Sequence, residues 1–360
     1  MIEAFIGKPI EALPTPALVV DIEALDHNLN FLADYFSKRS VKLRPHFKSN
    51  KCVTLAKRQL AAGSAVGITC AKLSEAEFLV AGGVTDVLIA NQVVGPEKAE
   101  RLASLNRKAR VRSAVDSETN VRELGLAAGA LRVNIGVLVE VDVGMRRSGV
   151  QPGSPALDLA RIVRRTAGLS FDGLQAYEGH LVTTPDPAER RARITAAMEP
   201  LNDTLQRLKA DGLSCALVSG GGTGSFDITG NLPQFNELQA GSYALMDSSY
   251  NKVAPQFRNA LSLLVTVISA KPDCVVVNAG LKTMGNEFGL PVVAEMPQAK
   301  ARYIAEEHTP IDNLSANVGD KIRLIPSHGC TTCNLHPRMW ITRRGVIEDV
   351  WEIEASGCLE

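Results

Sequence analysis

The feature of this 360-residue sequence that most limits its fold is a regular alternation of short β-branched runs with longer amphipathic stretches. The runs lie at 17–21, 41–46, 65–69, 86–90, 110–115, 134–142, 173–179, 215–222 and 237–246. Continuous apolar runs, each followed by a helical stretch, are typical of a parallel sheet covered on both faces. Eight or nine such units favour a (β/α)8 TIM barrel over an open doubly wound sheet.

The pattern changes at about residue 255. Strand-like runs follow without convincing helical stretches, and the sequence Arg-Arg-Gly at 343–345 is typical of a hairpin turn. A barrel of about 250 residues leaves the rest of the chain for a second, mostly antiparallel β domain. We predict a barrel over residues 14–254 and a β domain over residues 255–360, joined by residues 1–13.

Composition excludes several classes of partner. Lys and Arg number 39 and Asp and Glu also number 39, so zero net charge gives no long-range attraction to nucleic acid or to an anionic membrane. No apolar run approaches the roughly 20 residues of a membrane span, and the N-terminal sequence does not resemble a signal peptide. The seven scattered cysteines do not suggest a disulfide framework. We expect a cytoplasmic protein with reduced thiols.

A basic motif, RPHFKSNK at 44–51, follows one of the apolar runs. Barrel enzymes place catalytic groups at this end of their strands. Lys48 lies there beside Arg44, His46 and Lys51, and neighbouring cations would lower the pKa of its amine and improve it as a nucleophile toward an aldehyde. The alternative is a solvated basic loop.

Two glycine-containing motifs and one arginine motif could bind anions. The run VSGGGTGS at 218–225 offers several backbone N–H groups to a phosphate, and QAGSY at 239–243 could close the same site. The motif at 218–225 lacks the lysine of a Walker loop and the glycine spacing of a dinucleotide-binding motif. The alternative is a glycine-rich turn that binds no ligand. In VDVGMRRSGV at 141–150, an arginine could pair with a carboxylate or a ring substituent, although a surface role is favoured for Arg146.

A possible metal motif, PSHGCTTCNLHP, lies at 326–337 in the β domain. His328 and Cys330 would share one face of an extended segment, so an imidazole and a thiolate could bind one ion, with zinc favoured. Two protein ligands would leave an open, catalytic site. Taken alone, the motif favours a simpler interpretation, in which a histidine and two cysteines fill a turn.

Together these motifs resemble one family. TPALVVDIEALDHNL, LRPHFKSNKC, GITCAKLSEAE, VEVDVGMRRSGV, LQAYEGH, SGGGTGS, ELQAGSYALMD, AGLK and PSHGC occur in the order seen in the metal-assisted, pyridoxal-phosphate-dependent D-threonine aldolases, 3-hydroxy-D-aspartate aldolases and D-serine dehydratases. The resemblance runs from about residue 14 to the C-terminus. It implies the alanine-racemase type of fold (fold type III), with the cofactor in the barrel and a divalent metal in the β domain.

The resemblance also implies roles for individual residues. Lys48 matches the lysine that binds pyridoxal 5'-phosphate covalently, and His46 lies near the substrate as a second catalytic residue. The cofactor-binding positions are Lys48, Arg147, Tyr177, Thr223, Gly224, Gly241 and Ser242. His328 and Cys330 match the metal ligands, for zinc, manganese or magnesium. A homodimer is expected, because members of this fold complete their active sites with a partner's domain.

The implied reaction is cleavage of a D-3-hydroxy-amino acid to glycine and an aldehyde by a carbon-carbon lyase. The alternative is a D-serine or 3-hydroxy-D-aspartate dehydratase, a carbon-oxygen lyase that forms a keto acid and ammonia. A third possibility is a protein that binds the cofactor without turnover. Cys330 resembles the dehydratases, and Asn278 and Glu178 depart from the family pattern, whereas longer motifs such as GGGTGS and TTCNLH follow the aldolases. The longer agreement favours an aldolase, with native substrate and metal left open.

Overall fold

The computed structural model describes residues 2–360, which form two compact units. The β unit comprises Met1–Leu32, Ser49–Leu55 and Ser242–Gly357, and the barrel unit comprises Ala33–Lys48, Ala56–Gly241 and Cys358–Glu360. Among the described residues, no helix combines the length and the apolar character needed to cross a membrane.

The barrel unit contains an eight-stranded parallel sheet in the order β2-β9-β8-β7-β6-β5-β4-β3. Its strands are β2 (Lys42–Leu43), β3 (Ile68–Cys70), β4 (Asp86–Gln92), β5 (Arg110–Val115), β6 (Ile135–Glu140), β7 (Leu169–Ala176), β8 (Leu217–Gly220) and β9 (Glu237–Leu238). The two end strands meet through parallel bridges that join Leu43 to Ala65 and His46 to Thr69. The sheet therefore closes on itself, and the predicted (β/α)8 barrel is confirmed.

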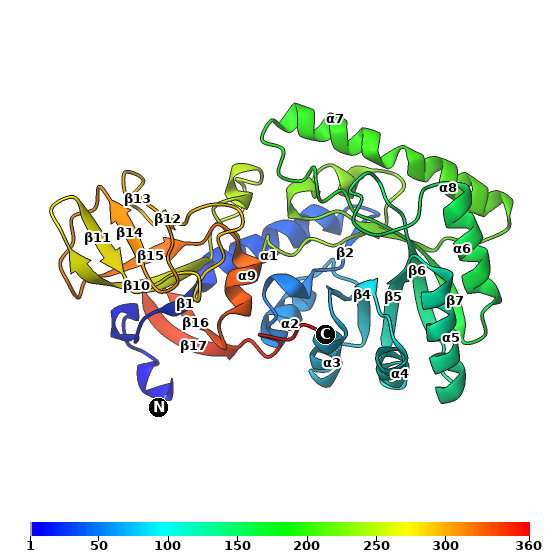
Figure 1. The fold of residues 1–360 in the computed structure, drawn as a ribbon, viewed down its shortest axis with the longest axis horizontal. Coiled ribbons are helices and arrows are strands. Elements are labelled where there is room, and N and C mark those ends of the chain that lie inside the picture. The colour runs from blue at the N-terminus through cyan, green and yellow to red at the C-terminus, as the bar shows by residue number, and fades with distance from the viewer. Residues whose placement is uncertain (1) are drawn as a thin grey trace. The chain divides into compact units, whose positions relative to one another are not determined.

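Helices follow most barrel strands and lie along their outer side (Figure 1). They are α2 (Val53–Ala61), α3 (Leu73–Ala81), α4 (Pro96–Leu105), α5 (Glu118–Leu131), α6 (Ser154–Arg165), α7 (Pro187–Met198) and α8 (Pro200–Ala210), while α1 (Ile22–Ser37) precedes β2. Helix α6 illustrates the packing, because Ala156, Ala160 and Val163 are buried at helical spacing. After β8 the chain instead forms short 3-10 turns, η4 (Thr223–Ser225) and η5 (Thr229–Asn231).

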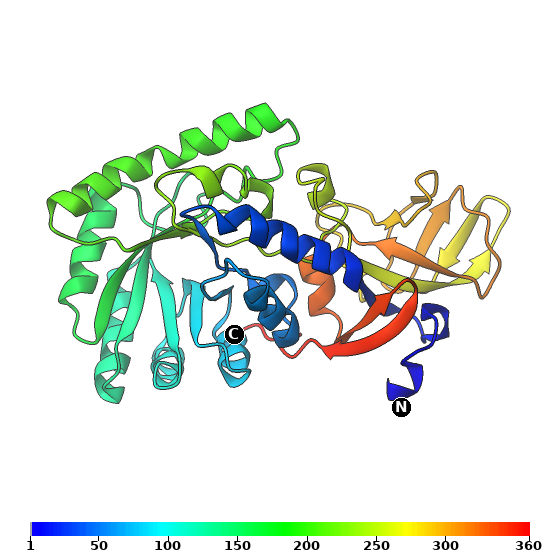
Figure 2. The same cartoon turned by 180° about the vertical axis from the view of Figure 1, so that it is seen from behind.

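The β unit contains a nine-stranded sheet in the order β11-β14-β13-β12-β15-β10-β1-β16-β17. Its strands are β1 (Ala17–Asp21), β10 (Leu261–Ala270), β11 (Cys274–Val277), β12 (Val292–Val293), β13 (Lys300–Ala301), β14 (Thr309–Asp312), β15 (Lys321–Ile325), β16 (Arg338–Arg343) and β17 (Val346–Glu352). All pairs are antiparallel except β1 with β16. Figure 2 shows the β16–β17 hairpin in red and the other late strands in yellow to orange. The predicted antiparallel β domain is confirmed.

The predicted hairpin turn at 343–345 joins β16 to β17. Arg343 pairs with Val346, and the two residues between them, Arg344 and Gly345, have φ values of 50° and 78°. Positive φ at both central positions matches the twist of a two-residue hairpin. The turn also contains a glycine where the left-handed conformation favours one.

The prediction that residues 17–21 form the first barrel strand is wrong. These residues are β1, which lies between β10 and β16 in the sheet of the β unit. Val19 packs there in an apolar cluster that includes Leu264 and Trp340. A short apolar run fits a buried strand of either sheet, so its composition could not choose between them. The barrel strands begin at β2, and the sequence boundary at residue 14 does not coincide with either unit.

A charged network fills the barrel near the starts of several strands. Arg44, only 2% exposed, donates through two nitrogens to the carboxylate of Glu237 at 2.8 Å each and through a third to Asp86 at 2.6 Å. Arg112 joins the same oxygen of Asp86 to Asp172, at 2.7 Å each. Two-pronged contacts of this kind satisfy the fixed geometry of a guanidinium.

Two glycines make room for this network. A Cβ at Gly67 would lie 2.2 Å from Nη1 of Arg44, and one at Gly136 would lie 2.5 Å from Oδ2 of Asp172. Real side chains do not approach so closely, so a larger residue would displace the ion pairs. Arg44 therefore belongs to the interior of the barrel, not to the solvated basic loop in which the sequence placed it.

Candidate active site

Three residues predicted to bind the cofactor converge where barrel strands end. Lys48 lies in the turn η3 (Phe47–Ser49) beyond β2, Tyr177 follows the last residue of β7, and Arg147 lies in the loop after β6. The Nζ of Lys48 is 6.0 Å from the centroid of the Tyr177 ring, and the guanidinium carbon of Arg147 is 5.6 Å from it. An aromatic ring with two cations nearby could orient an anionic, planar ligand.

His46 belongs to the same group and is buried. Burial, followed by the charges of Lys48 and Arg147, holds the pKa of its imidazole well below the usual value of 6.5. Each of these causes disfavours a further positive charge. His46 is therefore neutral near pH 7. Its predicted catalytic role, like the nucleophilic role of Lys48, stays a prediction.

The glycine-rich motif forms a tight loop after β8. A Cβ at Gly220 would lie 1.8 Å from the carbonyl oxygen of Ala176, and one at Gly224 would lie 2.1 Å from that of Val182. Packing alone therefore requires these two glycines. At Gly222 a Cβ would lie 3.5 Å from Cε2 of Tyr177, so this loop passes directly over the tyrosine ring.

The other predicted cofactor residues occupy different settings. Thr223 and Gly224 are buried in η4, one residue beyond Gly222. Ser242, in the β unit, has its Oγ 3.8 Å from Sγ of Cys330. Gly241 is also buried. Phosphate binding by these four residues stays a prediction.

The two predicted metal ligands lie together in the β unit. His328 is the residue before helix α9 (Gly329–Asn334), and Cys330 is the second residue of that helix. Burial lowers the pKa of the imidazole, but hydrogen bonds and charges from Cys330 and Glu287 outweigh it and raise the pKa to about 9. The extended segment expected from the sequence is absent at Cys330, because the chain turns into a helix and brings the two side chains together there.

The sequence did not point to Glu287, which accepts a hydrogen bond at Oε1 from Nδ1 of His328. Gly285 forms a bridge with His328, and a Cβ at Gly285 would lie only 2.0 Å from Oγ1 of Thr331. Burial raises the pKa of Glu287, but its hydrogen bonds with Thr331 and His328 bring it below the usual value. Carboxylates often fix the ring of a metal-binding histidine in this way.

This donor set fits an open divalent metal site. Glu287 occupies Nδ1 of His328, so Nε2 and the Cys330 sulfur remain as candidate protein ligands. Asp247, the other nearby carboxylate, accepts a hydrogen bond from the backbone of Gly329 at 3.0 Å. Across residues 2–360, no group of three or more His, Cys, Asp or Glu is arranged to hold a metal. Water or substrate would have to supply the other ligands, as in catalytic sites.

Asn278, which departs from the family pattern, and Cys333 both have structural surroundings. Asn278 accepts a hydrogen bond from the backbone N–H of Thr266 at 2.7 Å and donates to Oγ1 of Thr15 at 3.0 Å. Cys333 is completely buried, and burial raises the pKa of its thiol well above the usual value. Neither side chain presents a reactive group to solvent.

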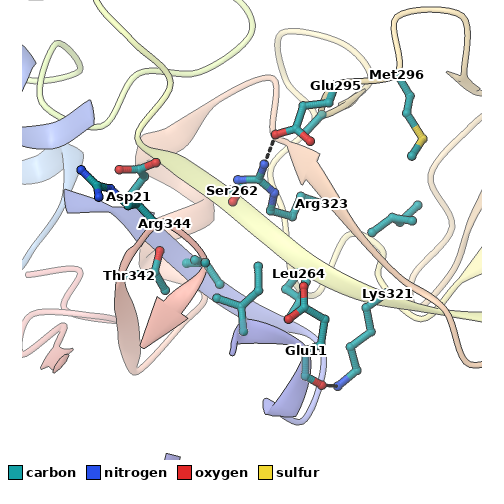
Figure 3. Close-up of a pocket in the computed structure, with 15 residues that line it drawn as sticks. Glu11, Asp21, Ser262, Leu264, Glu295, Met296, Lys321, Arg323, Thr342 and Arg344 are labelled. Atoms are coloured by element: carbon teal, nitrogen blue, oxygen red, sulfur yellow. Dashed lines mark hydrogen bonds and ion pairs between the residues drawn. The ribbon is translucent and has the colours of Figure 1, made fainter. Parts of the chain in front are cut away.

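A separate cavity of about 450 Å³ lies in the β unit (Figure 3). Three cations line it, and each already has a partner. Arg323 pairs with Glu295, Lys321 donates to the carbonyl oxygen of Glu11 at 2.6 Å, and Arg344 lies 3.3 Å from Glu23. None of the predicted site residues lines this cavity, so it does not contribute to the candidate active site.

Comparison with known proteins assigns the chain to a family. A family model described as the alanine racemase N-terminal domain matches residues 20–249, and one described as a putative serine dehydratase domain matches residues 260–342. The chain belongs to the alanine racemase N-terminal-domain family, and its full-length relatives include D-threonine and 3-hydroxy-D-aspartate aldolases. The family resemblance of the sequence motifs is confirmed.

The relatives match nearly the whole chain. A D-threonine aldolase from Arthrobacter sp is 39% identical over 98% of this chain and 95% of its own, and a 3-hydroxy-D-aspartate aldolase from Paracoccus denitrificans is 36% identical over 98% and 96%. The crystal structure of D-threonine aldolase from Filomicrobium marinum has a TM-score of 0.96 at 39% identity and 99% coverage of both chains. A D-threo-3-hydroxyaspartate dehydratase from Delftia sp. is 27% identical over 89% and 92%.

Proposed function

We propose that this protein is a pyridoxal-phosphate- and divalent-metal-dependent aldolase that cleaves D-3-hydroxy-amino acids to glycine and an aldehyde. The observation that carries the proposal is the grouping of Lys48 and Arg147 around the Tyr177 ring. Family membership and the names of its full-length relatives support it. The reaction would make the protein a carbon-carbon lyase.

Pyridoxal phosphate, when bound, would supply an electron sink for the bond that breaks at Cα. The residues present fit this group, since the Nζ of Lys48 and the Tyr177 ring lie together beside a buried glycine loop. The Nζ of Lys48 would hold the cofactor, Tyr177 would orient its ring, and Arg147 would bind an anionic substituent. Thr223 and Gly224, with Gly241 and Ser242, would hold the phosphate.

Proton transfer falls to His46, because burial and the neighbouring cations keep its imidazole neutral. The neutral ring offers an unprotonated nitrogen near pH 7, although its lowered pKa makes it a weak base. A divalent ion held by Nε2 of His328 and Sγ of Cys330 would lower the pKa of the substrate β-hydroxyl. The thiolate favours zinc over manganese or magnesium. Glu287 would keep the ring of His328 in the binding orientation.

The test is incubation of the purified protein with D-threonine or D-phenylserine, pyridoxal phosphate and each of the three metals. We expect glycine and the matching aldehyde in equal amounts, and less product after chelation of the metal. The L-isomers serve as the matched control. Release of no glycine from any D-substrate would reject the aldolase.

A dehydratase is the second candidate, favoured by one observation. Cys330 is the position at which the motifs resemble D-serine dehydratases, and its thiol interacts directly with His328. This reaction would release ammonia and a keto acid from D-serine or 3-hydroxy-D-aspartate. Assays of both products with both substrates separate the two candidates.

Two further properties are proposed, the first from the family resemblance and the second from the composition of the sequence. We expect a homodimer, whose mass sedimentation equilibrium would measure, and a cytoplasmic location, which fractionation of the source cells would test. Small amino acids are the expected substrates, and neither nucleic acid nor a membrane is an expected partner.

A further inference from the structure

Glu178 is a completely buried carboxylate that directly follows Tyr177 beyond β7. The sequence marked this residue only as a departure from the family pattern. A buried carboxylate is costly unless hydrogen-bond donors surround it. The groups that contact Glu178 therefore indicate which part of the structure the carboxylate stabilises.

Most of the groups that stabilise this carboxylate belong to the loop after β8, and the backbone N–H of Glu178 itself is another. The hydroxyl of Thr229 donates to Oε1, and Ser225 and the backbone N–H of Gly221 lower the pKa of the carboxyl, while Oε2 has no hydrogen-bond partner among the described residues. Burial raises the pKa of Glu178, and these hydrogen bonds oppose that change. A backbone N–H can only donate, so the site requires an acceptor at this position.

The three partners define the shape of the loop. Gly221 begins it with φ of 70°, a left-handed conformation that favours glycine, and Ser225 closes it. The Oγ of Ser225 accepts a hydrogen bond from N–H of Gly222 at 3.1 Å, while its own N–H donates to the Gly222 carbonyl oxygen at 3.2 Å. Glu178 thus contacts this loop through Thr229, which follows the segment that contains Thr223 and Gly224.

We propose that Glu178 is a positioning residue that shapes the loop at 221–229 to bind the phosphate group of the cofactor. This inference rests on the proposed function, because it assumes that Thr223 and Gly224 bind that phosphate. Glu178 acts through the loop and does not itself touch the ligand. Its position next to Tyr177 in the chain links the tyrosine ring and the phosphate loop through one residue.

The phosphate itself provides a specific readout. Pyridoxal and pyridoxal phosphate share the ring and the aldehyde that Lys48 would bind, and they differ only in the phosphate. Absorbance titration of the cofactor-free protein with each compound gives two dissociation constants. Their ratio measures phosphate recognition separately from the reaction with the lysine.

The informative variant is Glu178→Gln. It preserves side-chain size but removes the negative charge that the hydrogen-bond donors of the loop stabilise. We expect the dissociation constant for pyridoxal phosphate to rise about tenfold, while that for pyridoxal changes less than about twofold. Thr229→Val removes one hydroxyl and should give a smaller change of the same kind. A circular dichroism spectrum checks that each variant is folded.

The matched control is Glu75→Gln. Glu75 is another buried carboxylate of the barrel unit, and it accepts hydrogen bonds from the backbone of Ala71 at 2.7 Å and Lys72 at 3.2 Å. Loss of this carboxylate should leave the ratio of the two dissociation constants unchanged. A similar rise in this control would show a general effect of removing a buried charge and would overturn the proposal.

The outcomes separate the inference from the proposed function. If the wild-type protein binds neither compound, the proposed function is rejected, and the inference falls with it. If the wild type prefers pyridoxal phosphate and Glu178→Gln shows the same preference, only the inference is overturned. If Glu178→Gln does not fold, Thr229→Val decides, and an unchanged ratio in that variant overturns the inference.

Discussion

The two ends of the barrel use charge differently. Near the strand starts, Arg44 is buried and its guanidinium makes three short contacts with Glu237 and Asp86. At the strand ends, the Arg147 side chain is 49% exposed, and its ion pair with Glu140 is 3.9 Å long. Charges whose partners are close and buried serve the fold, whereas a cation held loosely beside an aromatic ring is available to a ligand. Four changes test this difference.

The largest expected effect is on catalysis at the strand ends. Lys48→Ala should lower kcat/KM by about 10⁴-fold or more, since it removes the proposed nucleophile. Borohydride should then attach no cofactor covalently to the protein. Thermal unfolding should change little, because the role of Lys48 is chemical. A reducible cofactor adduct in Lys48→Ala would show that another residue is the nucleophile.

Arg44→Met, at the other end, should instead lower the free energy of unfolding, by about 3 to 5 kcal/mol. The variant leaves Glu237 buried without the guanidinium that contacts both of its oxygens. Urea unfolding measures the change, and kcat per folded molecule should stay near that of the wild type. Arg193→Met, which removes an exposed ion pair on α7, is the control and should unfold like the wild type. Loss of catalysis without loss of stability in Arg44→Met would contradict the comparison.

Gly136→Ala should destabilise the same network by about 2 kcal/mol. Its new methyl group would lie 2.5 Å from Oδ2 of Asp172 and 3.1 Å from Cγ of Arg112. Gly129→Ala is the matched control, since a Cβ on that residue of α5 would meet nothing within 4 Å. The control should be as stable as the wild type or slightly more stable. Equal stability of the two variants would mean that the network tolerates displacement.

The smallest expected effect is a pH dependence from His46. Its folded-state pKa lies well below 6.5, so below about pH 6.5 the unfolded chain binds a proton that the folded protein does not. The free energy of unfolding should therefore fall as the pH is lowered through and below that value. His46→Asn should show a shallower decline between pH 7 and pH 5 in urea unfolding of the cofactor-free protein. Parallel pH profiles for variant and wild type would contradict a buried, neutral His46.

Sequence periodicity was enough to predict the barrel and the β domain, because each repeats one local pattern many times. It failed for β1, whose five apolar or half-buried residues fit either sheet. It also missed α9, since the sequence Gly-Cys-Thr-Thr-Cys-Asn has no amphipathic repeat. A local sequence pattern indicates whether a segment is a helix or a strand, but it does not indicate which other elements that segment packs against.

Some residues of the candidate site could likewise be predicted from the sequence, and others could not. Lys48, Arg147 and Tyr177 were found through motifs at strand ends, and the structure brings them together. The hydrogen bond from His328 to Glu287 spans 41 residues, so no local spacing could reveal it. Arg44 was mistaken for a member of the basic loop because its partners, Asp86 and Glu237, begin distant strands. Contacts of this kind depend on the closed barrel.

The placement of β1 also affects the order in which the chain can fold during synthesis. Val19 pairs with Ser262 on one side and with Trp340 on the other. All eight barrel strands are translated after Val19 and before Ser262 and Trp340. They can therefore pair with one another before either neighbouring strand of β1 exists. Contacts between such distant residues form slowly. The nine-stranded sheet can be completed only after β17 has been translated, and until then β1 is an apolar segment that can aggregate or bind chaperones.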